Sequence, residues 1–296
     1  MRQMALFSDG QADVYADIVN VASVPQRSPF RYPGGKTWLI PRVRRWLRSR
    51  HPLSALLIEP FAGGGIVSLT AAFEKLAEHI LMVELDDQVA AVWHTIIEGD
   101  ADWLALQIAQ FELTPEEVAT ALANDDPTPQ AKAFRTILKN RVQRGGILAP
   151  GAGLIKYGED GRGLASRWYP TTLKRRILDI ARVRERLTFI EGDGLDVMRA
   201  FAHHDDAVFF IDPPYTAAGK RAGSRLYTCS DLDHDELFVI ASTLRGNFLM
   251  TYDDAEGVRD LARKHGFDTE TIAMKNTHHA KMTELLISRD LDWLRR

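Results

Sequence analysis

The chain has 296 residues, is 45% hydrophobic and carries a formal net charge of -3, which is ordinary for a globular protein with a sizeable core. Its single cysteine, Cys229, excludes an intrachain disulfide, and no Cys and His residues lie at metal-ligand spacing, so we expect no structural zinc. No run of about 18 apolar residues is present. The first residues also include acids where a signal peptide needs an apolar stretch, so the sequence predicts a cytoplasmic protein without a membrane span.

The first third of the chain alternates between strand and helix patterns. Residues 1–27 lack clear periodicity and are predicted to be an N-terminal extension. Apolar runs predict strands, glycines predict a turn, and apolar residues at helical spacing predict helices. The expected elements are the strand 53–58, the turn 63–65, the helix 66–77, the strand 79–85 and the helix 86–99. This order is typical of an α/β fold with parallel strands.

The alternation stops near residue 100 and resumes near residue 187. The intervening part is mostly polar helix with a glycine-rich interruption at 143–163, which predicts an inserted module. After it, strands and helices alternate again. The expected elements are the strands 187–193, 207–212, 247–252, 269–275 and 283–289 and the helices 231–244 and 255–266.

Positive charge is concentrated in the inserted module. Residues 131–186 contain 14 Lys and Arg against 4 Asp and Glu, whereas the rest of the chain has 23 against 36. Such segregation favours binding to a polyanion, because each neutralised phosphate releases counterions.

The turn EPFAGGG, residues 59–65, joins a predicted strand to a predicted helix. Its glycines allow backbone amides to approach a ligand at the positive end of the helix dipole. Glu84 ends the next strand, 21 residues after Gly63, where doubly wound folds place the acid that accepts from ribose hydroxyls. Together these features predict a cofactor that contains adenosine. NAD is disfavoured, because Ser68 replaces the third glycine of its fingerprint.

The residues Asp212, Pro213, Pro214 and Tyr215 end a buried strand abruptly. An exocyclic amine such as the 6-amino group of adenine is a poor nucleophile, because its lone pair is delocalised into the ring. The Asp212 carboxylate and the Pro213 carbonyl, held rigid by the prolines, would accept the amine hydrogens and localise that lone pair. Tyr215 would stack on a base turned out of the helix, a contact worth roughly 1–3 kcal/mol.

Three motifs in this order, RYPGGK (31–36), EPFAGGG (59–65) and IDPPY (211–215), resemble those of the Dam-like DNA adenine methyltransferases. The resemblance implies a Rossmann-like methyltransferase fold, with a mixed sheet and helices on both faces. It implies S-adenosylmethionine as methyl donor, no metal, and transfer to adenine in double-stranded DNA by base flipping. The implied division is a catalytic, cofactor-binding domain of residues 28–100 and 187–296 and a helical, basic target-recognition domain of residues 101–186.

The resemblance also assigns roles by position. The implied cofactor-binding residues are Tyr32, Lys36, Phe61, Gly63, Gly65, Glu84, Asp193 and Asp212. The implied catalytic residues are Asp212, Pro213, Pro214 and Tyr215. The candidates for contacts to DNA are Arg141, Arg144, Lys174, Arg175 and Arg176. The residues that follow Asn140 and Arg141 do not match a pattern from which a recognition sequence would follow.

Alternatives remain open at this point. The residues Asp212 to Tyr215, which we call the proline corner, would also serve methylation of the cytosine amino group or of adenine in RNA. A similar motif serves methylation of a glutamine amide. A non-catalytic DNA-binding regulator would explain the basic module but not the glycine turn, Glu84 and the proline corner. A cognate restriction endonuclease is a candidate partner.

Overall fold

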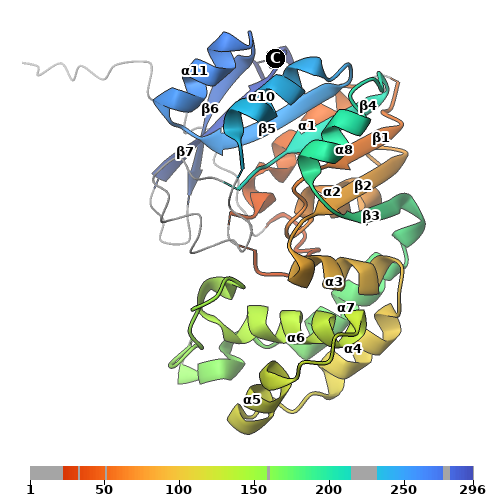
Figure 1. Cartoon of the computed structure of the whole chain (residues 1–296), viewed down its shortest axis with the longest axis vertical. Coiled ribbons are helices and arrows are strands. Elements are labelled where there is room, and N and C mark those ends of the chain that lie inside the picture. Colours follow the sequence, from red (N-terminus) through yellow and green to blue (C-terminus); the bar gives the residue numbers. More distant parts are fainter. Residues whose placement is uncertain are drawn as a thin grey trace, which may run out of the picture.

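The computed structural model describes residues 23–32, 34–50, 52–158, 161–214, 232–275 and 281–295. Within these residues, the chain folds around a seven-stranded sheet of order β3-β2-β1-β4-β5-β7-β6 (Figure 1). The strands are β1 (Leu56–Glu59), β2 (His79–Glu84), β3 (Leu187–Glu191), β4 (Ala207–Ile211), β5 (Asn247–Asp253), β6 (Asp268–Lys275) and β7 (Lys281–Ser288). Strands β1 to β5 pair in parallel, whereas β7 is antiparallel to both of its neighbours.

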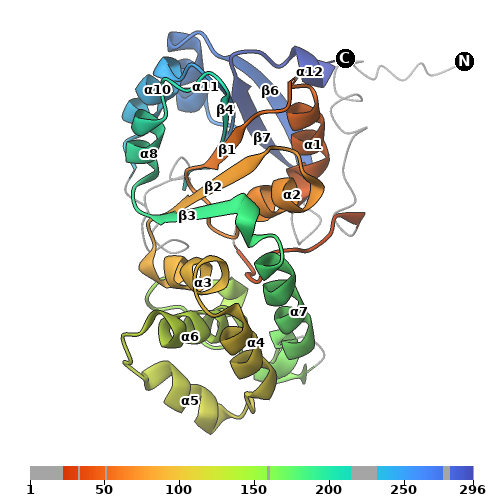
Figure 2. The same ribbon diagram turned by 90° about the vertical axis from the view of Figure 1, so that its right-hand side faces the viewer.

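The mixed sheet with helices on both faces is the α/β fold that the sequence predicts. Helices α8 (Gly194–Ala200), α10 (His234–Thr243) and α11 (Glu256–Lys264) cover one face, and α1 (Ile40–Arg48) and α2 (Ile66–Glu74) cover the other (Figure 2). All five residues of β4 are buried, which explains why this strand reads as a continuous apolar run.

A helical module lies beside the β3 edge of the sheet (Figure 1). Its helices are α4 (Ala101–Gln110), α5 (Pro115–Ala123), α6 (Pro129–Val142) and α7 (Pro170–Ala181). Helices α4, α6 and α7 pack against α3 (Asp87–Ile97), and α5 packs against α6. Side chains of Asp100, Thr114 and Thr128 cap the N-termini of α4, α5 and α6. Apolar residues of the module belong to the same hydrophobic core that lies under one face of the sheet. The division of the chain into two domains at residues 100 and 186 therefore stays a prediction.

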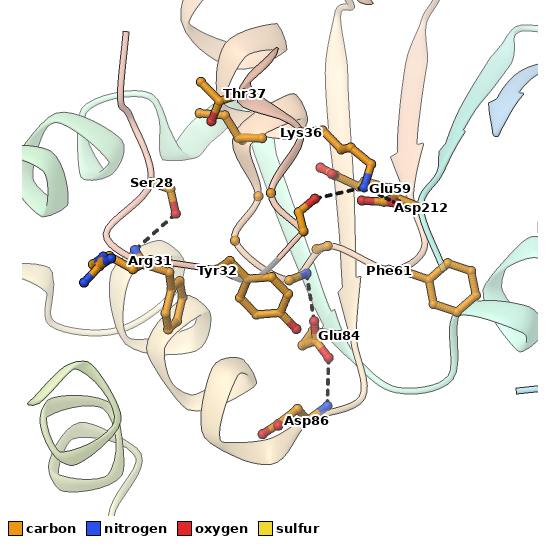
Figure 3. A pocket seen from close by; sticks show the side chains of 18 of the residues that line it. Ser28, Arg31, Tyr32, Lys36, Thr37, Glu59, Phe61, Glu84, Asp86 and Asp212 are labelled. Atoms are coloured by element: carbon orange, nitrogen blue, oxygen red, sulfur yellow. Dashed lines mark hydrogen bonds and ion pairs between the residues drawn. The ribbon is translucent and has the colours of Figure 1, made fainter. Parts of the chain in front are cut away.

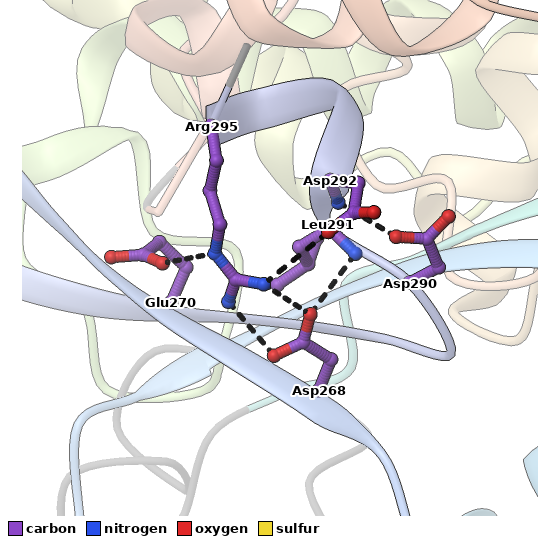
Figure 4. A network of polar contacts seen from close by, with 6 residues as sticks. All are labelled: Asp268, Glu270, Asp290, Leu291, Asp292 and Arg295. Carbon is purple, nitrogen blue, oxygen red and sulfur yellow. Dashed lines mark hydrogen bonds and ion pairs between the residues drawn. The ribbon is translucent and has the colours of Figure 1, made fainter.

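The last described helix, α12 (Asp292–Arg295), is tied to strand β6 by the Arg295 guanidinium (Figure 4). Arg295 makes two contacts to Asp268, of 2.7 and 2.8 Å, and one of 3.2 Å to Glu270. Among the residues described, no helix has the length and apolar character required to cross a membrane.

Candidate active site

A cavity of about 860 Å³ opens between the carboxyl ends of β1, β2 and β4 and the helical module. Strand β1 lies between β2 and β4, which is the point where the strand order reverses and where open α/β sheets bind ligands. The volume lies in the range of about 300–1,000 Å³ that is usual for small-molecule and cofactor sites. Twelve of the predicted site residues line it: Tyr32, Lys36, Phe61, Gly63, Gly65, Glu84, Asp193, Asp212, Pro213 and Pro214, together with Arg141 and Arg176 of the module.

The glycine bend, residues 63–65, forms one wall of this cavity. Gly63 and Gly65 have φ angles of +48° and +62°, which residues with a Cβ atom rarely adopt. The indole N–H of Trp93 donates a hydrogen bond of 2.9 Å to the Gly63 carbonyl. A Cβ atom on Gly65 would lie 2.7 Å from Met82 and 2.9 Å from the Trp93 ring, so only glycine fits there. Trp93 has no motif of its own, and the sequence did not indicate its role.

The Glu84 carboxylate joins the end of β2 to the bend (Figure 3). Its Oε2 accepts from the Gly63 amide at 2.8 Å, and its Oε1 accepts from the amides of Leu85 and Asp86 at 2.9 Å. Burial raises the pKa of Glu84 to about 7, against the opposing effect of these hydrogen bonds. The predicted proximity of Gly63 and Glu84 is therefore present in the fold.

Tyr32 lies against the same bend. A Cβ atom on Gly63 would be 2.6 Å from the Tyr32 ring, and one on Gly64 would be 2.9 Å from the Tyr32 Cβ. Asp193, which also lines the cavity, caps α8 by accepting from the Leu195 amide at 2.8 Å. The cavity wall thus combines an aromatic ring, open backbone and carboxylates.

Asp212 follows β4 directly, and two donors hold its Oδ1 atom. The hydroxyl of Thr251 donates to Oδ1 at 2.7 Å, and the Lys36 ammonium lies 3.0 Å from the same atom (Figure 3). Pro213 is buried and Pro214 is partly buried. The stacking residue predicted at Tyr215 lies outside the described residues, as does Cys229.

Lys36 is buried, with 2% of its side chain exposed, and is surrounded by acidic groups. Its ammonium donates to the Gly34 carbonyl at 2.9 Å and lies 3.6 Å from Glu284 Oε2 on β7. Burial lowers the pKa of Lys36, but the charges of Asp212 and Glu284 outweigh this effect and raise it above its ordinary value. Burial raises the pKa of Glu284 to about 7, although Lys36 opposes the shift.

Glu59, at the end of β1, is a further acidic residue of the cavity that the sequence did not single out. It accepts from the Ser68 amide at 2.9 Å and from the Ser68 hydroxyl, at the N-terminus of α2. Burial raises the pKa of Glu59 to about 8, against these hydrogen bonds.

The five basic candidates for DNA contact are placed differently. Arg144, Lys174 and Arg175 are exposed on the module. Arg141 is buried and donates to the Pro29 carbonyl, and Arg176 is half-buried and donates to the Ser28 carbonyl at 3.0 Å. Burial, together with neighbouring arginines, lowers the pKa of Arg141 to about 9. The sequence could not show that these two side chains join the module to the segment before β1.

The sequence is 24% identical over 280 residues to a DNA N-6-adenine-methyltransferase of Escherichia phage P1, an alignment that covers 89% of this chain and 34% of that protein. The sequence is thus similar to that of an adenine methyltransferase. This similarity confirms the resemblance that the three motifs indicate, although the chain spans about a third of that relative's length. No family model matches the sequence.

Solved structures of methyltransferases show weaker likenesses, which concern the fold alone. A Pyrococcus horikoshii protein assigned as an RNA methyltransferase matches with a TM-score of 0.40 and 11% identity, over 88% of this chain and 84% of its own. The rRNA methyltransferase aviRa from Streptomyces viridochromogenes matches with a TM-score of 0.37 and 11% identity, over 89% of this chain and 88% of its own.

Proposed function

We propose that this protein is a site-specific DNA methyltransferase that transfers a methyl group from S-adenosylmethionine to the 6-amino group of adenine in double-stranded DNA. One observation carries the proposal: the Asp212 corner opens into the same cavity as the glycine bend and Glu84. A cofactor that contacts the bend and Glu84 therefore shares a single space with the acid and prolines suited to an aromatic amine. The phage relative, which is named for adenine methylation, supports this choice of base.

The residues of the cavity fit S-adenosylmethionine by their chemistry. Glu84 offers a carboxylate to ribose hydroxyls, the bend offers open backbone, and Asp193 offers a second carboxylate in the cavity wall. Tyr32 and Phe61 add apolar surface. When bound, the cofactor supplies a methyl carbon attached to a positively charged sulfur.

The corner prepares the amine. The Asp212 carboxylate, oriented by Thr251 and Lys36, and the Pro213 carbonyl accept the two amine hydrogens and localise the nitrogen lone pair. Because an alkylated amine loses its proton easily, orientation rather than a strong base supplies most of the acceleration. This step needs no metal.

Duplex DNA hides the adenine amine inside the base stack, so the base has to rotate out before it reaches the cavity. Exposed Arg144, Lys174 and Arg175 face solvent on the module and are suited to contacts with phosphates. In this proposal residues 28–100 and 187–296 bind the cofactor and catalyse transfer, and residues 101–186 read the target. A cognate endonuclease is a further candidate partner.

The test compares the wild type with Asp212→Asn and with Asp205→Asn, an exposed control outside the cavity. Bacterial DNA is incubated with S-adenosylmethionine labelled in the methyl group, digested to nucleosides and separated. We expect N6-methyl-2′-deoxyadenosine from the wild type and the control. We expect a loss of at least about 100-fold from Asp212→Asn, with DNA binding in gel shifts unchanged.

Other products decide between the alternatives. Methylated cytosine, or methylation of RNA in preference to DNA, would assign another substrate to the same corner. Full activity of Asp212→Asn would refute the mechanism. A wild type that binds DNA but not the cofactor would indicate a regulator.

A further inference from the structure

The leading segment, residues 28–32, carries Tyr32 to the glycine bend, and side chains of the module hold its backbone. Asn140 of α6 is fully buried, and its side-chain amide forms two hydrogen bonds with the backbone of Arg31. Its Oδ1 accepts from the Arg31 amide at 2.9 Å, and its Nδ2 donates to the Arg31 carbonyl at 3.0 Å. The same Nδ2 donates to the Gly146 carbonyl at 2.7 Å, which fixes the orientation of the amide.

Two arginines of the module extend this attachment. Arg141 of α6 donates to the Pro29 carbonyl, and Arg176 of α7 donates to the Ser28 carbonyl at 3.0 Å. The carbonyls of residues 28, 29 and 31 therefore bond to side chains that lie more than 100 positions later in the chain. The backbone carbonyls of this irregular segment thus find their hydrogen-bond partners in the module, as the carbonyls of a strand find theirs in a neighbouring strand.

The attachment continues to the cofactor wall. The Phe30 ring lies 5.7 Å, centroid to centroid, from the Trp93 ring, and Trp93 donates to the Gly63 carbonyl. Tyr32 lies directly against Gly63 and Gly64. Tyr32 and the bend are thus connected to α6 and α7, because the neighbours of Tyr32 in the segment are bonded to those helices.

We propose that Asn140, Arg141 and Arg176 are positioning residues through which the module sets the shape of the cofactor pocket. The inference rests on the proposed function and adds a regulation to it: DNA on the module and cofactor in the cavity each change the affinity for the other. Such coupling is reciprocal, so the two ligands alter each other's binding by the same factor. In this proposal the attached segment with Tyr32 is the connection between the two ligand sites.

A pair of glycines provides a matched test. Gly146 has a φ of +75°, and an added Cβ would lie 2.4 Å from the Arg31 carbonyl oxygen. Gly151 has a φ of +85°, and an added Cβ would meet nothing within 4 Å. Both Gly→Ala changes introduce the same backbone strain, but only Gly146→Ala presses on the leading segment. Gly146 does not line the cavity, so any effect on the cofactor is transmitted.

The experiment titrates S-adenosylhomocysteine calorimetrically into the whole chain, with and without sheared bacterial DNA. We expect Gly146→Ala to weaken binding at least fivefold and to remove the effect of DNA, whereas Gly151→Ala stays within twofold of the wild type. Asn140→Leu, of similar size and also outside the cavity lining, should weaken binding similarly, with Asn124→Leu at an exposed position as its control. In turnover, KM for S-adenosylmethionine should rise more than kcat falls.

Melting curves show which variants are folded, and Asn140→Leu decides the matter if Gly146→Ala does not fold. Unchanged S-adenosylhomocysteine affinity in a folded variant would overturn the inference while leaving the proposed function intact. A wild type that does not bind S-adenosylhomocysteine would instead refute the proposed function. An affinity that DNA does not alter in the wild type would contradict the coupling.

Discussion

The hydroxyl of Thr251 donates a hydrogen bond of 2.7 Å to Oδ1 of Asp212. Thr251 is fully buried in β5, next to β4, so the acid after β4 is oriented by the neighbouring strand. The Lys36 ammonium approaches the same oxygen from the segment before α1. The carboxylate is therefore held by two parts of the chain that are distant in sequence.

Replacing Thr251 by Val tests this orientation, because the change removes one donor and keeps the shape. We expect kcat to fall about tenfold or more, since small displacements of reacting groups are costly, while the affinity for S-adenosylhomocysteine stays the same. Steady-state kinetics and calorimetry provide the two measurements. Thr95→Val is the matched control, because Thr95 is also buried but donates to the Ala91 carbonyl in α3. Equal losses in both variants would show a general packing effect.

Trp93→Phe tests the hydrogen bond that supports the glycine bend. Loss of the indole N–H leaves the Gly63 carbonyl without this donor, at a cost of about 1 kcal/mol. We expect S-adenosylhomocysteine to bind several-fold more weakly, and the free energy of unfolding in urea to fall by a similar amount. Trp103→Phe, in the module, is the control. Undiminished affinity in Trp93→Phe would mean that the bend keeps its shape without this bond.

Glu59→Gln tests the effect of a buried acid on stability. The pKa of Glu59 is about 8 in the folded protein and near 4.5 when unfolded, so the folded state binds more protons between these values. Stability therefore falls as pH rises from about 4.5 to 8. The neutral amide removes this contribution, and Glu84 and Glu284 retain a slope of the same sign.

Thermal unfolding without ligand should show a higher midpoint for Glu59→Gln than for the wild type at pH 8, by several degrees, since about 1 kcal/mol moves the midpoint by about 2–4 °C. At pH 5 the gain should vanish. Glu112→Gln, at an exposed position, should track the wild type at both pH values. A gain that is equal at pH 5 and pH 8 would contradict the assignment.

Local signals were sufficient to predict much of this fold. The strand that becomes β4 is a continuous apolar run ended by two prolines, and the glycines at 63 and 65 mark a bend that needs positive φ. The strand predicted at 53–58 begins at Leu56 instead, because only its last residues pair with β2 and β4. Boundaries of this kind depend on neighbours that the local pattern does not contain.

The residues that support the site could not be predicted from local sequence patterns. Thr251, Trp93 and Glu284 lie within ordinary strands and helices, and nothing in their spacing distinguishes them from core positions. Their contacts arise only when β5, α3 and β7 come together around the cavity. For Arg141 and Arg176 the sequence did give a signal, their positive charge, and it predicted contacts with DNA at the surface. In the structure both side chains point inward and donate to backbone carbonyls of the leading segment.

Under the proposed function, the attachment of the leading segment to α6 and α7 also limits how target specificity can be exchanged between related proteins. A module grafted from a relative would arrive without partners for the carbonyls of residues 28, 29 and 31 unless it brought its own donors. Successful chimaeras should therefore transplant the short stretch before the first strand together with the helices, as one inherited unit.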